Sequence, residues 1–346
     1  MYIELLTTKR EAEYTEFLQD KDEALFNSSL MFRDLLIKTT GAEPCYFLAI
    51  NCGKIVGVLP VFIKHGKYGA VLNSMPWYGS NPGIIVKYTY ISPIQEIETF
   101  LLNAFHQFAK DQKVISSTII SRPFENVGVY LDGFCYDTID SRIGMVTDIS
   151  SGDIINSFHP KTRNLIRKAQ KEKVKVYESL SLDDLLFVAD LHKLNMEKIG
   201  GIPKPQKLFL DLNSVARIGK DFKVWIAEEH GQKIAGLVLK YFNKTVDYMT
   251  PAINVEFRSF QPLNLLIFEA MQDAAMLGYK SWNWGGTTLP EQQGVFHYKE
   301  RFGAKKCNYF YLTKVYDDSI YQLDKKTILS EYPYFYVCPF NNLKEE

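Results

Sequence analysis

A strongly cationic segment, residues 161–176, lies near the middle of a chain whose formal net charge is +0. Its seven basic side chains stand beside a single acidic one, Glu172; they are Lys161, Arg163, Arg167, Lys168, Lys171, Lys173 and Lys175. Guanidinium groups form paired hydrogen bonds to phosphate oxygens, so Arg163, Arg167 and Lys168 could bind the phosphates of a ligand. A solvated helix face has the same composition, and the sequence leaves both interpretations open.

The cationic segment has the pattern of an amphipathic helix. Pro160 suits the first position of this helix, which we expect to span residues 160–173. At helical spacing Ile166 and Ala169 share one face, whereas the arginines share another. The apolar face can therefore pack on the protein while the guanidinium groups remain accessible.

Three titratable side chains elsewhere in the chain could accept a proton. His192 lies in a helical segment, and a neutral imidazole is suited to proton transfer near pH 7. Asp247 and Glu269 are rival candidates for the general base. A histidine packed on a helix, or a carboxylate that only supports the fold, would look the same in the sequence. All three residues therefore remain candidates.

The sequence carries no motif for a covalent nucleophile or a metal site. It has no serine elbow and no paired cysteine and histidine motif, which favours direct transfer between two bound substrates. The 5 cysteines are scattered and never spaced as CxxC. We therefore expect free thiols in a reducing compartment, with neither a disulfide framework nor a zinc site.

Composition and length indicate a globular protein. A chain of 346 residues is long enough for two domains of average size. The first residues lack the pattern of a signal peptide and no apolar run approaches the length of a membrane span, so we expect a cytoplasmic protein without integral membrane insertion. Zero net charge argues against a nucleic-acid interface over a whole face, and we expect no DNA binding, although a local phosphate site is compatible with this charge.

The expected helices and strands occur twice in the same order. In the first half, a helical pattern is followed by a hairpin, a strand, a loop, a helix and a strand, at residues 10–40, 46–62, 68–72, 74–86, 93–110 and 114–121. The second half repeats this order at residues 182–198, 224–242, 245–250, 251–264, 265–278 and 279–284. The hairpins match in sequence, Lys54-Ile-Val-Gly57 with Lys233-Ile-Ala-Gly236. We therefore predict two α/β (α+β) domains, residues 1–150 and 151–346, the second beginning with the basic helix.

Two further segments complete a family pattern. Trp282-Asn-Trp-Gly-Gly286 and Gly294-Val-Phe-His-Tyr-Lys-Glu-Arg-Phe-Gly303 follow the second copy. Together with the duplicated unit and the basic segment, they resemble the FemAB/FemX-like branch of the GNAT acyltransferase superfamily over residues 25–312. The resemblance implies two tandem GNAT-like (acyl-CoA N-acyltransferase-like) domains, each with a mixed central sheet flanked by helices, and an enzyme that forms amide bonds.

The resemblance also implies the classes of substrate. The best-known members of this family transfer an amino acid from aminoacyl-tRNA to an amine of a peptidoglycan precursor, and related acetyltransferases are associated with acyl-CoA. We therefore expect an acyltransferase that acts on an amine of a cell-envelope or polysaccharide precursor, with the donor as a co-substrate and no tightly bound cofactor. An acetyl-CoA-dependent N-acetyltransferase is one alternative. A non-catalytic protein that binds RNA or a sugar nucleotide is another.

The resemblance assigns roles to two positions in the second half. Lys299 matches the lysine of the family's terminal motif, and Tyr298 stands where phenylalanine is usual. The Lys299 ammonium would neutralise a phosphate or the oxyanion of a tetrahedral intermediate, and a solvated lysine beside Glu300 is the alternative. In this superfamily a backbone N–H on a splayed central strand also stabilises the oxyanion. Here that strand falls near Tyr248.

A loop in the first half matches the family's acceptor-site loop at Trp77, Tyr78 and Asn81. These side chains could stack on a sugar or a base, although aromatic residues in such loops also serve as packing anchors. The arginines of the basic helix would then hold the diphosphate of a sugar-nucleotide acceptor or the acceptor end of a tRNA. We expect them to point into the same groove as Lys299.

One segment departs from the pattern of acyl-CoA-dependent relatives. Those proteins carry a glycine-rich loop whose backbone N–H groups hold the CoA pyrophosphate at a helix N-terminus. Here the segment reads Arg258-Ser-Phe-Gln-Pro-Leu263, with Gln261 and Leu263 at the glycine positions. Pro262 has no N–H to donate. This departure disfavours CoA in its usual pose and favours aminoacyl-tRNA or another activated carrier.

Overall fold

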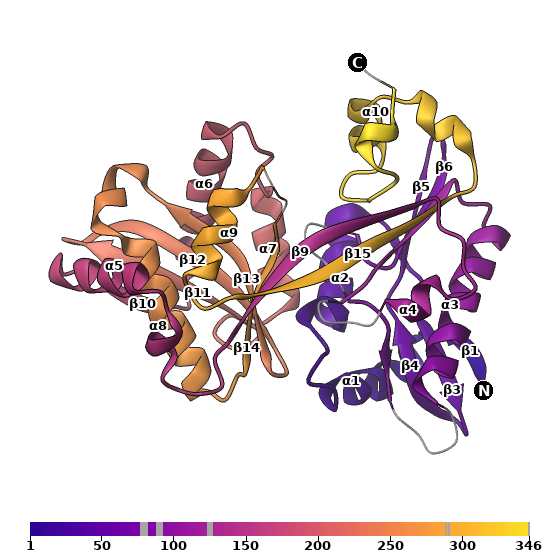
Figure 1. The fold of residues 1–346 in the computed structure, drawn as a ribbon, viewed down its shortest axis with the longest axis horizontal. Helices are drawn as coiled ribbons and strands as arrows, with labels where there is room; N and C mark the ends of the chain where they lie inside the picture. Colours follow the sequence, from indigo (N-terminus) through magenta and orange to yellow (C-terminus); the bar gives the residue numbers. More distant parts are fainter. Residues whose placement is uncertain (77–81, 88–92, 123–126, 288, 290, 345–346) are drawn as a thin grey trace. The chain divides into compact units, whose positions relative to one another are not determined.

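The computed structural model describes residues 1–76, 82–87, 93–122, 127–287, 289 and 291–344 (Figure 1). The chain forms two compact units, one made of Met1–Ile143 with Cys307–Glu346 and the other of Gly144–Lys306. The division expected from the sequence, 1–150 and 151–346, differs from this at residues 144–150 and, to a larger extent, at the C-terminal segment Cys307–Glu346. The C-terminal segment packs with the first unit because β15 (Lys305–Val315) pairs with β8 (Ser116–Ile120) in antiparallel register.

The first unit contains a four-stranded sheet in the order β1-β3-β4-β7 and a strand series in the order β15-β8-β6-β5-β2. Its other strands are β1 (Tyr2–Leu5), β2 (Glu43–Pro44), β3 (Phe47–Asn51), β4 (Lys54–Leu59), β5 (Phe62–Gly66), β6 (Gly69–Asn73), β7 (Ile85–Val86) and the start of β9 (Thr138–Asp148). Its helices are α1 (Glu11–Gln19), α2 (Leu30–Thr40), α3 (Ile94–Asp111), α4 (Gly128–Leu131) and α10 (Lys325–Glu331). The buried face of α3, with Ile97, Leu101 and Phe105, supplies much of the core.

The second strand of the first hairpin is interrupted at Pro60. β4 ends at Leu59, β5 begins at Phe62, and the two belong to different strand series. Proline cannot donate to a strand ladder, so the backbone changes direction at this residue. The corresponding strand of the second unit, β12 (Gln232–Phe242), has no proline and runs without interruption.

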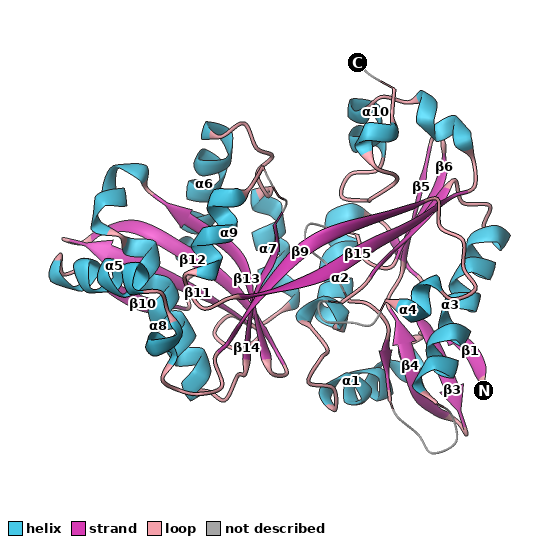
Figure 2. Ribbon diagram, in the orientation of Figure 1, coloured by secondary structure: helices cyan, strands magenta, loops and turns pink. Residues whose placement is uncertain are grey.

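The second unit is built on the strand order β10-β11-β12-β13-β14. The remaining strands are β10 (Lys175–Ser179), β11 (Phe222–Glu229), β13 (Thr245–Ile253) and β14 (Ser281–Thr287). The helices are α5 (Pro160–Lys171), α6 (Leu182–Lys198), α7 (Gln206–Val215), α8 (Pro262–Met276) and α9 (Gln293–Glu300) (Figure 2). Neighbouring strands are antiparallel except β13 and β14, which are parallel. This mixed sheet with flanking helices confirms the predicted fold class.

The two faces of the second sheet carry different residues. Gly236 of β12 lies against Val188 of α6, so side chains on that side of the sheet face α6. On the opposite side, Phe268 of α8 meets Phe158, which in turn contacts Phe302. Because cross-strand partners share a face, every polar or aromatic side chain of β12, β13 and β14 can be assigned to the α6 face or the α8 face.

The predicted basic helix forms as α5. Pro160 occupies its first turn, and the His159 side chain caps it by accepting a hydrogen bond from the backbone N–H of Lys161 at 3.1 Å. Ile166 and Ala169 are buried, and the helix packs on α8. Within the described ranges, no helix is long and apolar enough to cross a membrane.

Candidate active site

The pairing between strands β13 and β14 ends at one defined position. Their parallel pairing runs from Thr245 and Ser281 to Asp247 and Asn283. There the Asn283 amide donates to Asp247 Oδ1 at 2.8 Å, and Asn283 Oδ1 accepts from the backbone N–H of Gly285 at 3.0 Å. Gly285 has φ +70°, a left-handed conformation that only glycine adopts readily. Asn283 thus links the two strands at the point, here called the vertex, where β14 turns away.

A β-bulge in β13 follows the vertex immediately. Leu239 of β12 pairs with Tyr248 and Val238 pairs with Thr250, so Met249 is the extra residue of β13. Bulges re-aim backbone groups and are common beside active sites. The bulge lies where the resemblance expects the strand that supplies an oxyanion donor, and the role of its N–H groups stays a prediction.

Charged side chains are buried on the α6 face of the vertex. Asp247 and Lys240 are cross-strand partners, with Asp247 Oδ2 4.0 Å from Lys240 Nζ, and they are only 6% and 9% exposed. Burial raises the pKa of Asp247, while Lys240 and the Asn283 hydrogen bond act in the opposite direction. Burial also lowers the pKa of Lys240. Lys204, in the connection between α6 and α7, has its pKa lowered to about 8 by burial and by Lys240.

His192 holds this connection in place. Its Nε2 accepts a hydrogen bond from the backbone N–H of Lys204 at 3.2 Å, and burial lowers its pKa to about 4. The ring is therefore neutral near pH 7, and its acceptor nitrogen is already used by the backbone. This contact supports the structural interpretation of His192 rather than the catalytic one.

Aromatic side chains fill the α8 face of the vertex. The Tyr248 ring lies 4.9 Å from that of Trp284 and 6.1 Å from that of Trp282. Both tryptophans are buried at alternate positions of β14, as the sequence predicted. Tyr298 packs against Phe302, and its buried hydroxyl has no hydrogen-bond partner among the residues that the structure describes. Burial raises the pKa of both tyrosines, so they remain protonated at neutral pH.

Lys299 is buried in α9, with only 5% of its surface exposed. Its ammonium donates to the carbonyl of Gly286 at 3.0 Å and to Thr287 Oγ1 at 2.7 Å, so it binds the end of β14. Burial lowers its pKa to about 8. Glu300 lies beside His297 instead, at 3.2 Å. The alternative of a solvated lysine beside Glu300 is therefore wrong, because Lys299 is directed into the protein beside the parted strands.

Glu269 lies on α8 and is half-buried. Burial raises its pKa, which suits a general base. Among the residues that the structure describes, none at the vertex contacts its carboxylate. Its catalytic role stays a prediction.

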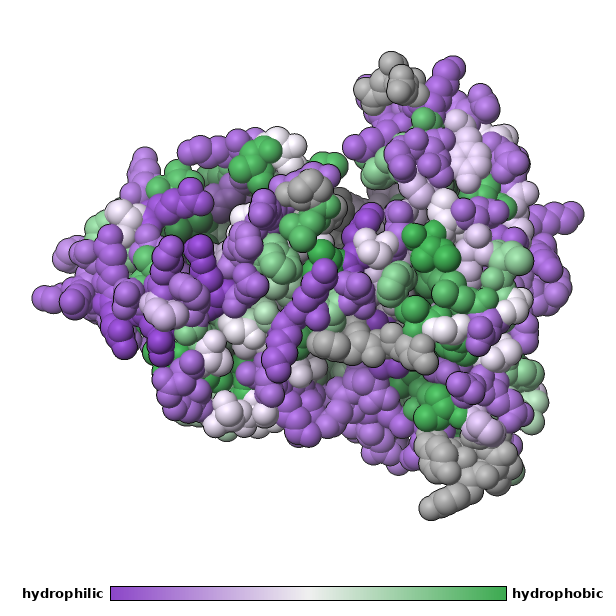
Figure 3. Space-filling view, viewed as in Figure 1, coloured by the Kyte–Doolittle hydropathy of each residue, from purple (hydrophilic) through white to green (hydrophobic). Residues whose placement is uncertain are grey.

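The basic face of α5 is accessible. Arg167 and Lys168 are exposed and Arg163 is half-buried. Arg167 donates to Asn164 Oδ1 of the same helix at 3.2 Å. Figure 3 shows an almost entirely hydrophilic surface over this helix. Both the phosphate-binding and the solvated interpretation survive, and a shared groove with Lys299 stays a prediction.

The loop at the N-terminus of α8 is closed by one of its own side chains. Gln261 has φ +60°, the conformation for which glycine is usual, and its Nε2 donates to the Arg258 carbonyl at 3.0 Å. Its Oε1 accepts from the Asn264 amide at 3.1 Å. Gln261 thus has a backbone conformation typical of glycine, and its side chain is hydrogen-bonded to Arg258 before it and Asn264 after it.

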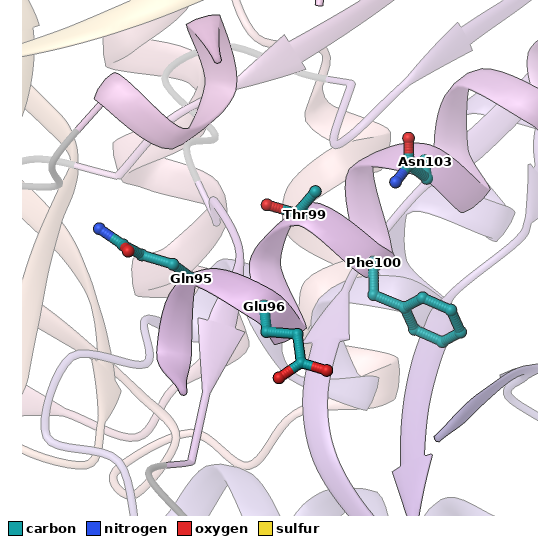
Figure 4. A pocket seen from close by; sticks show the side chains of 5 residues that line it. All are labelled: Gln95, Glu96, Thr99, Phe100 and Asn103. Atoms are coloured by element: carbon teal, nitrogen blue, oxygen red, sulfur yellow. The ribbon is translucent and has the colours of Figure 1, made fainter. Parts of the chain in front are cut away.

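Asn283, Lys240 and Lys204 were not among the site residues predicted from the sequence. A signal for Lys240 existed, because a lysine within a long apolar strand marks a buried partner. Trp77, Tyr78 and Asn81 lie outside the described residues. A surface depression on α3, lined by Gln95, Glu96, Thr99, Phe100 and Asn103, holds none of the predicted site residues (Figure 4).

Comparisons with known proteins agree with this geometry. Residues 210–309 match the FemAB family. The structure of FemX matches with a TM-score of 0.73 at 16% identity, covering 90% of this chain and 97% of FemX. A tandem GNAT protein from the clavulanic acid biosynthesis pathway matches with a TM-score of 0.53 at 8% identity, covering 90% of this chain and 98% of that one.

L-PGS from Bacillus licheniformis matches with a TM-score of 0.52 at 12% identity, over 87% of this chain and 90% of L-PGS. No curated protein matches the sequence. Identities this low show a shared fold and nothing more. The chain is thus FemAB-like in the sequence of residues 210–309, on a FemX-like fold of GNAT-like units, as the resemblance implied.

Proposed function

We propose that this protein is a FemAB-type acyltransferase that transfers an aminoacyl or acyl group to an amine of a cell-envelope or polysaccharide precursor. The observation that carries the proposal is the parting of β13 from β14 beside a bulge, within the segment that matches the FemAB family. A gap between two strands exposes backbone donors in a buried setting. Such donors can bind and polarise a carbonyl group.

The reaction that fits this site is direct attack of an amine on the donor carbonyl. Holding the two substrates together removes much of the entropic barrier, so no covalent enzyme intermediate is needed. The developing oxyanion would be stabilised by the backbone at the bulge and by the Lys299 ammonium. With a pKa of about 8, Lys299 is still largely charged at pH 7.

The loop before α8 supports aminoacyl-tRNA over acyl-CoA as the donor. The Gln261 side chain is hydrogen-bonded within the loop at a position where acyl-CoA-dependent relatives have glycine, and Pro262 removes one N–H from the first turn of α8. Calorimetry with acetyl-CoA tests this point. We expect no saturable binding to the wild type, and saturable binding that weakens in Arg258→Ala would establish the acetyltransferase alternative.

The basic face of α5 would bind phosphates of the tRNA acceptor end or of a sugar-nucleotide acceptor. We expect the double variant Arg163→Ala/Arg167→Ala to bind charged tRNA about 10-fold more weakly and with a shallower dependence on salt. A matched control is Lys325→Ala/Lys326→Ala, which removes two exposed cations from α10. Equal weakening in both variants would show a non-specific charge effect.

A transfer assay tests the proposed function as a whole. The protein is incubated with mixed charged tRNA or with acetyl-CoA, and with a lysine-containing peptidoglycan precursor or UDP-glucosamine as acceptor. Amide product detected by mass spectrometry supports an acyltransferase. Salt-sensitive RNA binding without consumption of any donor would instead support the non-catalytic alternative.

A further inference from the structure

The carboxylate of Asp247 is buried at the vertex. Asp247 is 6% exposed, its Oδ1 accepts from the Asn283 amide at 2.8 Å, and its Oδ2 lies 4.0 Å from Lys240 Nζ. A buried charge is costly unless its partners compensate for lost water. A separation of 4.0 Å is too long for a hydrogen bond. In this structure Oδ2 is therefore opposed by a charge but is not hydrogen-bonded to it.

A second polar group on the same face has no partner. Thr250 pairs with Val238 and Asp247 pairs with Lys240, and Val238 and Lys240 are two residues apart on β12, so both side chains of β13 face α6. Thr250 Oγ1 is fully buried and has no hydrogen-bond partner among the residues described. Buried hydroxyls are normally hydrogen-bonded, so Thr250 Oγ1 is a candidate partner for a ligand's polar group.

The bulge brings these groups within reach of the expected reaction centre. Asp247 and Thr250 flank Tyr248 and Met249, where the strand leaves its regular register. Their partners on β12, Lys240 and Val238, are two residues apart, which along a strand is roughly 6.6 Å, and a carboxylate side chain and a bound amine nitrogen can bridge this distance. By its cross-strand pairing, the Asp247 carboxylate lies on the α6 face, opposite the aromatic side chains of β14.

We propose that Asp247 accepts the proton of the substrate amine in the transfer reaction, and that Asn283 is the positioning residue that orients its carboxylate. This inference rests on the proposed function and assigns the acceptor amine to the α6 face of the vertex. Asp247 Oδ2 takes one proton from the substrate ammonium, and the neutral nitrogen then bonds to the donor carbonyl carbon. The bond from that carbon to the ester oxygen of the aminoacyl donor breaks, and the leaving oxygen takes a second proton from the same nitrogen. An amide and a free hydroxyl result, and Asp247 releases its proton to solvent.

The groups around Asp247 suit this role. Lys240 on β12 contributes positive charge and Asn283 on β14 contributes a neutral donor. Further out, Lys204 in the α6–α7 connection acts on Lys240, and His192 on α6, which accepts from the Lys204 backbone, is neutral near pH 7. Burial moves the carboxyl's pKa upward, towards the range in which a base works well at neutral pH. The acid limb of the rate should therefore lie above the pH expected for an ordinary aspartate.

The test compares two acceptors in the wild type and in Asp247→Asn. With charged tRNA as donor and a lysine-containing peptidoglycan precursor as acceptor, we expect kcat to fall about 100-fold or more. Hydroxylamine is a weak base and is unprotonated at neutral pH, so with it the same variant should lose less than about 5-fold. Equal losses with both acceptors, or no loss with either, would overturn the inference.

Two controls separate catalysis from folding and from the choice of substrate. Lys240→Met removes the opposing cation and should move the acid limb to higher pH, which a purely structural role would not do. Infrared difference spectra of wild type minus Asp247→Asn report the carboxyl's protonation without any substrate. Titration near or below the ordinary value of about 3.9 would contradict the inference, even if the transfer assay found no acceptor. Failure of every donor in the wild type would reject the proposed function separately.

Discussion

The two units carry different side chains at the corresponding position of their parallel strand pairs. In the first unit the parallel pairing of β6 with β8 ends at Asn73 and Thr118. In the second, the pairing of β13 with β14 ends at Asp247 and Asn283. Both units thus have the parallel pair, but the first has a neutral amide at the position where the second has a carboxylate.

The residue that pairs with this position on the next strand also differs between the units. Asn73 pairs with Phe62 of β5, whereas Asp247 pairs with Lys240 of β12. In the first unit the C-terminal segment also covers this position, since Thr118 donates to the Tyr336 carbonyl at 3.3 Å. The same segment lies beside β6, where the Tyr332 hydroxyl donates to the Gly69 carbonyl (Figure 1). The first unit therefore holds a covered, uncharged version of the site, and we assign the chemistry to the second.

Removing the lysine beside the parted strands should produce the largest effect. We expect Lys299→Ala to lower kcat by about 100- to 1,000-fold, because an oxyanion in a buried site loses its positive neighbour. The rate of amide formation under saturating donor measures this change. An unchanged rate would mean that Lys299 only anchors Gly286 and Thr287.

The pH profile of Lys299→Arg supplies the control. The Lys299 ammonium is present below its pKa of about 8 and is lost above it, so wild-type activity should decline as pH rises through that value. A guanidinium stays charged throughout this range. The alkaline limb should therefore move upward in the variant, and a limb that stays in place would exclude Lys299 as its cause.

The next largest effect should come from placing a carboxylate in the first unit, at the position that corresponds to Asp247. Asn73→Asp buries a charge beside Phe62, with no cation in the place of Lys240, and should destabilise the first unit by about 3 kcal/mol. Burial would raise the folded pKa of this carboxyl above its unfolded value. Stability should then be highest below about pH 4 and fall as pH rises towards the folded pKa. Urea melts at low and neutral pH measure the difference.

Asn73→Leu is the matched control for this substitution. Neither amide atom of Asn73 has a hydrogen-bond partner among the residues described, and the side chain is fully buried. Replacing it by an apolar side chain of similar size should be neutral or stabilising. A loss as large as that of Asn73→Asp would show that shape, not charge, distinguishes the two units here.

The sequence was informative about elements whose pattern is local. The basic helix formed as α5 because Pro160 starts it and Ile166 and Ala169 repeat at helical spacing. The order of helices and strands in both halves followed from the same periodicities. The packing of residues 307–346 with the first unit could not be read in this way, since it depends on β15 pairing with β8, which lies far away along the chain.

Fewer features of the candidate site could be predicted from the sequence. Lys299 was found through a motif, whereas its hydrogen bonds to Gly286 and Thr287 depend on how α9 packs on β14. Asn283 was missed because its role depends on register, which puts it opposite Asp247. Register is set by hairpin turns and bulges, and a shift of one residue moves each side chain to the other face.

The two hairpins show how sequence similarity and register can disagree. Matching Lys54-Ile-Val-Gly57 with Lys233-Ile-Ala-Gly236 implies an insertion in the second copy. The structure has none, because Asn51 pairs with Lys54 and Glu229 pairs with Gln232. Both hairpins also shift register at the same step, after Ala49 and after Ala227.

The smallest expected effects test this equivalence at the two turns. Cys52 and Gly53 have φ +48° and +77°, and His230 and Gly231 have φ +46° and +81°, so both turns are of type I′. Asparagine tolerates the first of these positions better than cysteine or histidine. Cys52→Asn and His230→Asn should each therefore stabilise the protein by about 0.5 kcal/mol, measured by urea unfolding. If the hairpins are equivalent the two gains should agree, and opposite signs would show that the turns have diverged although their registers have not.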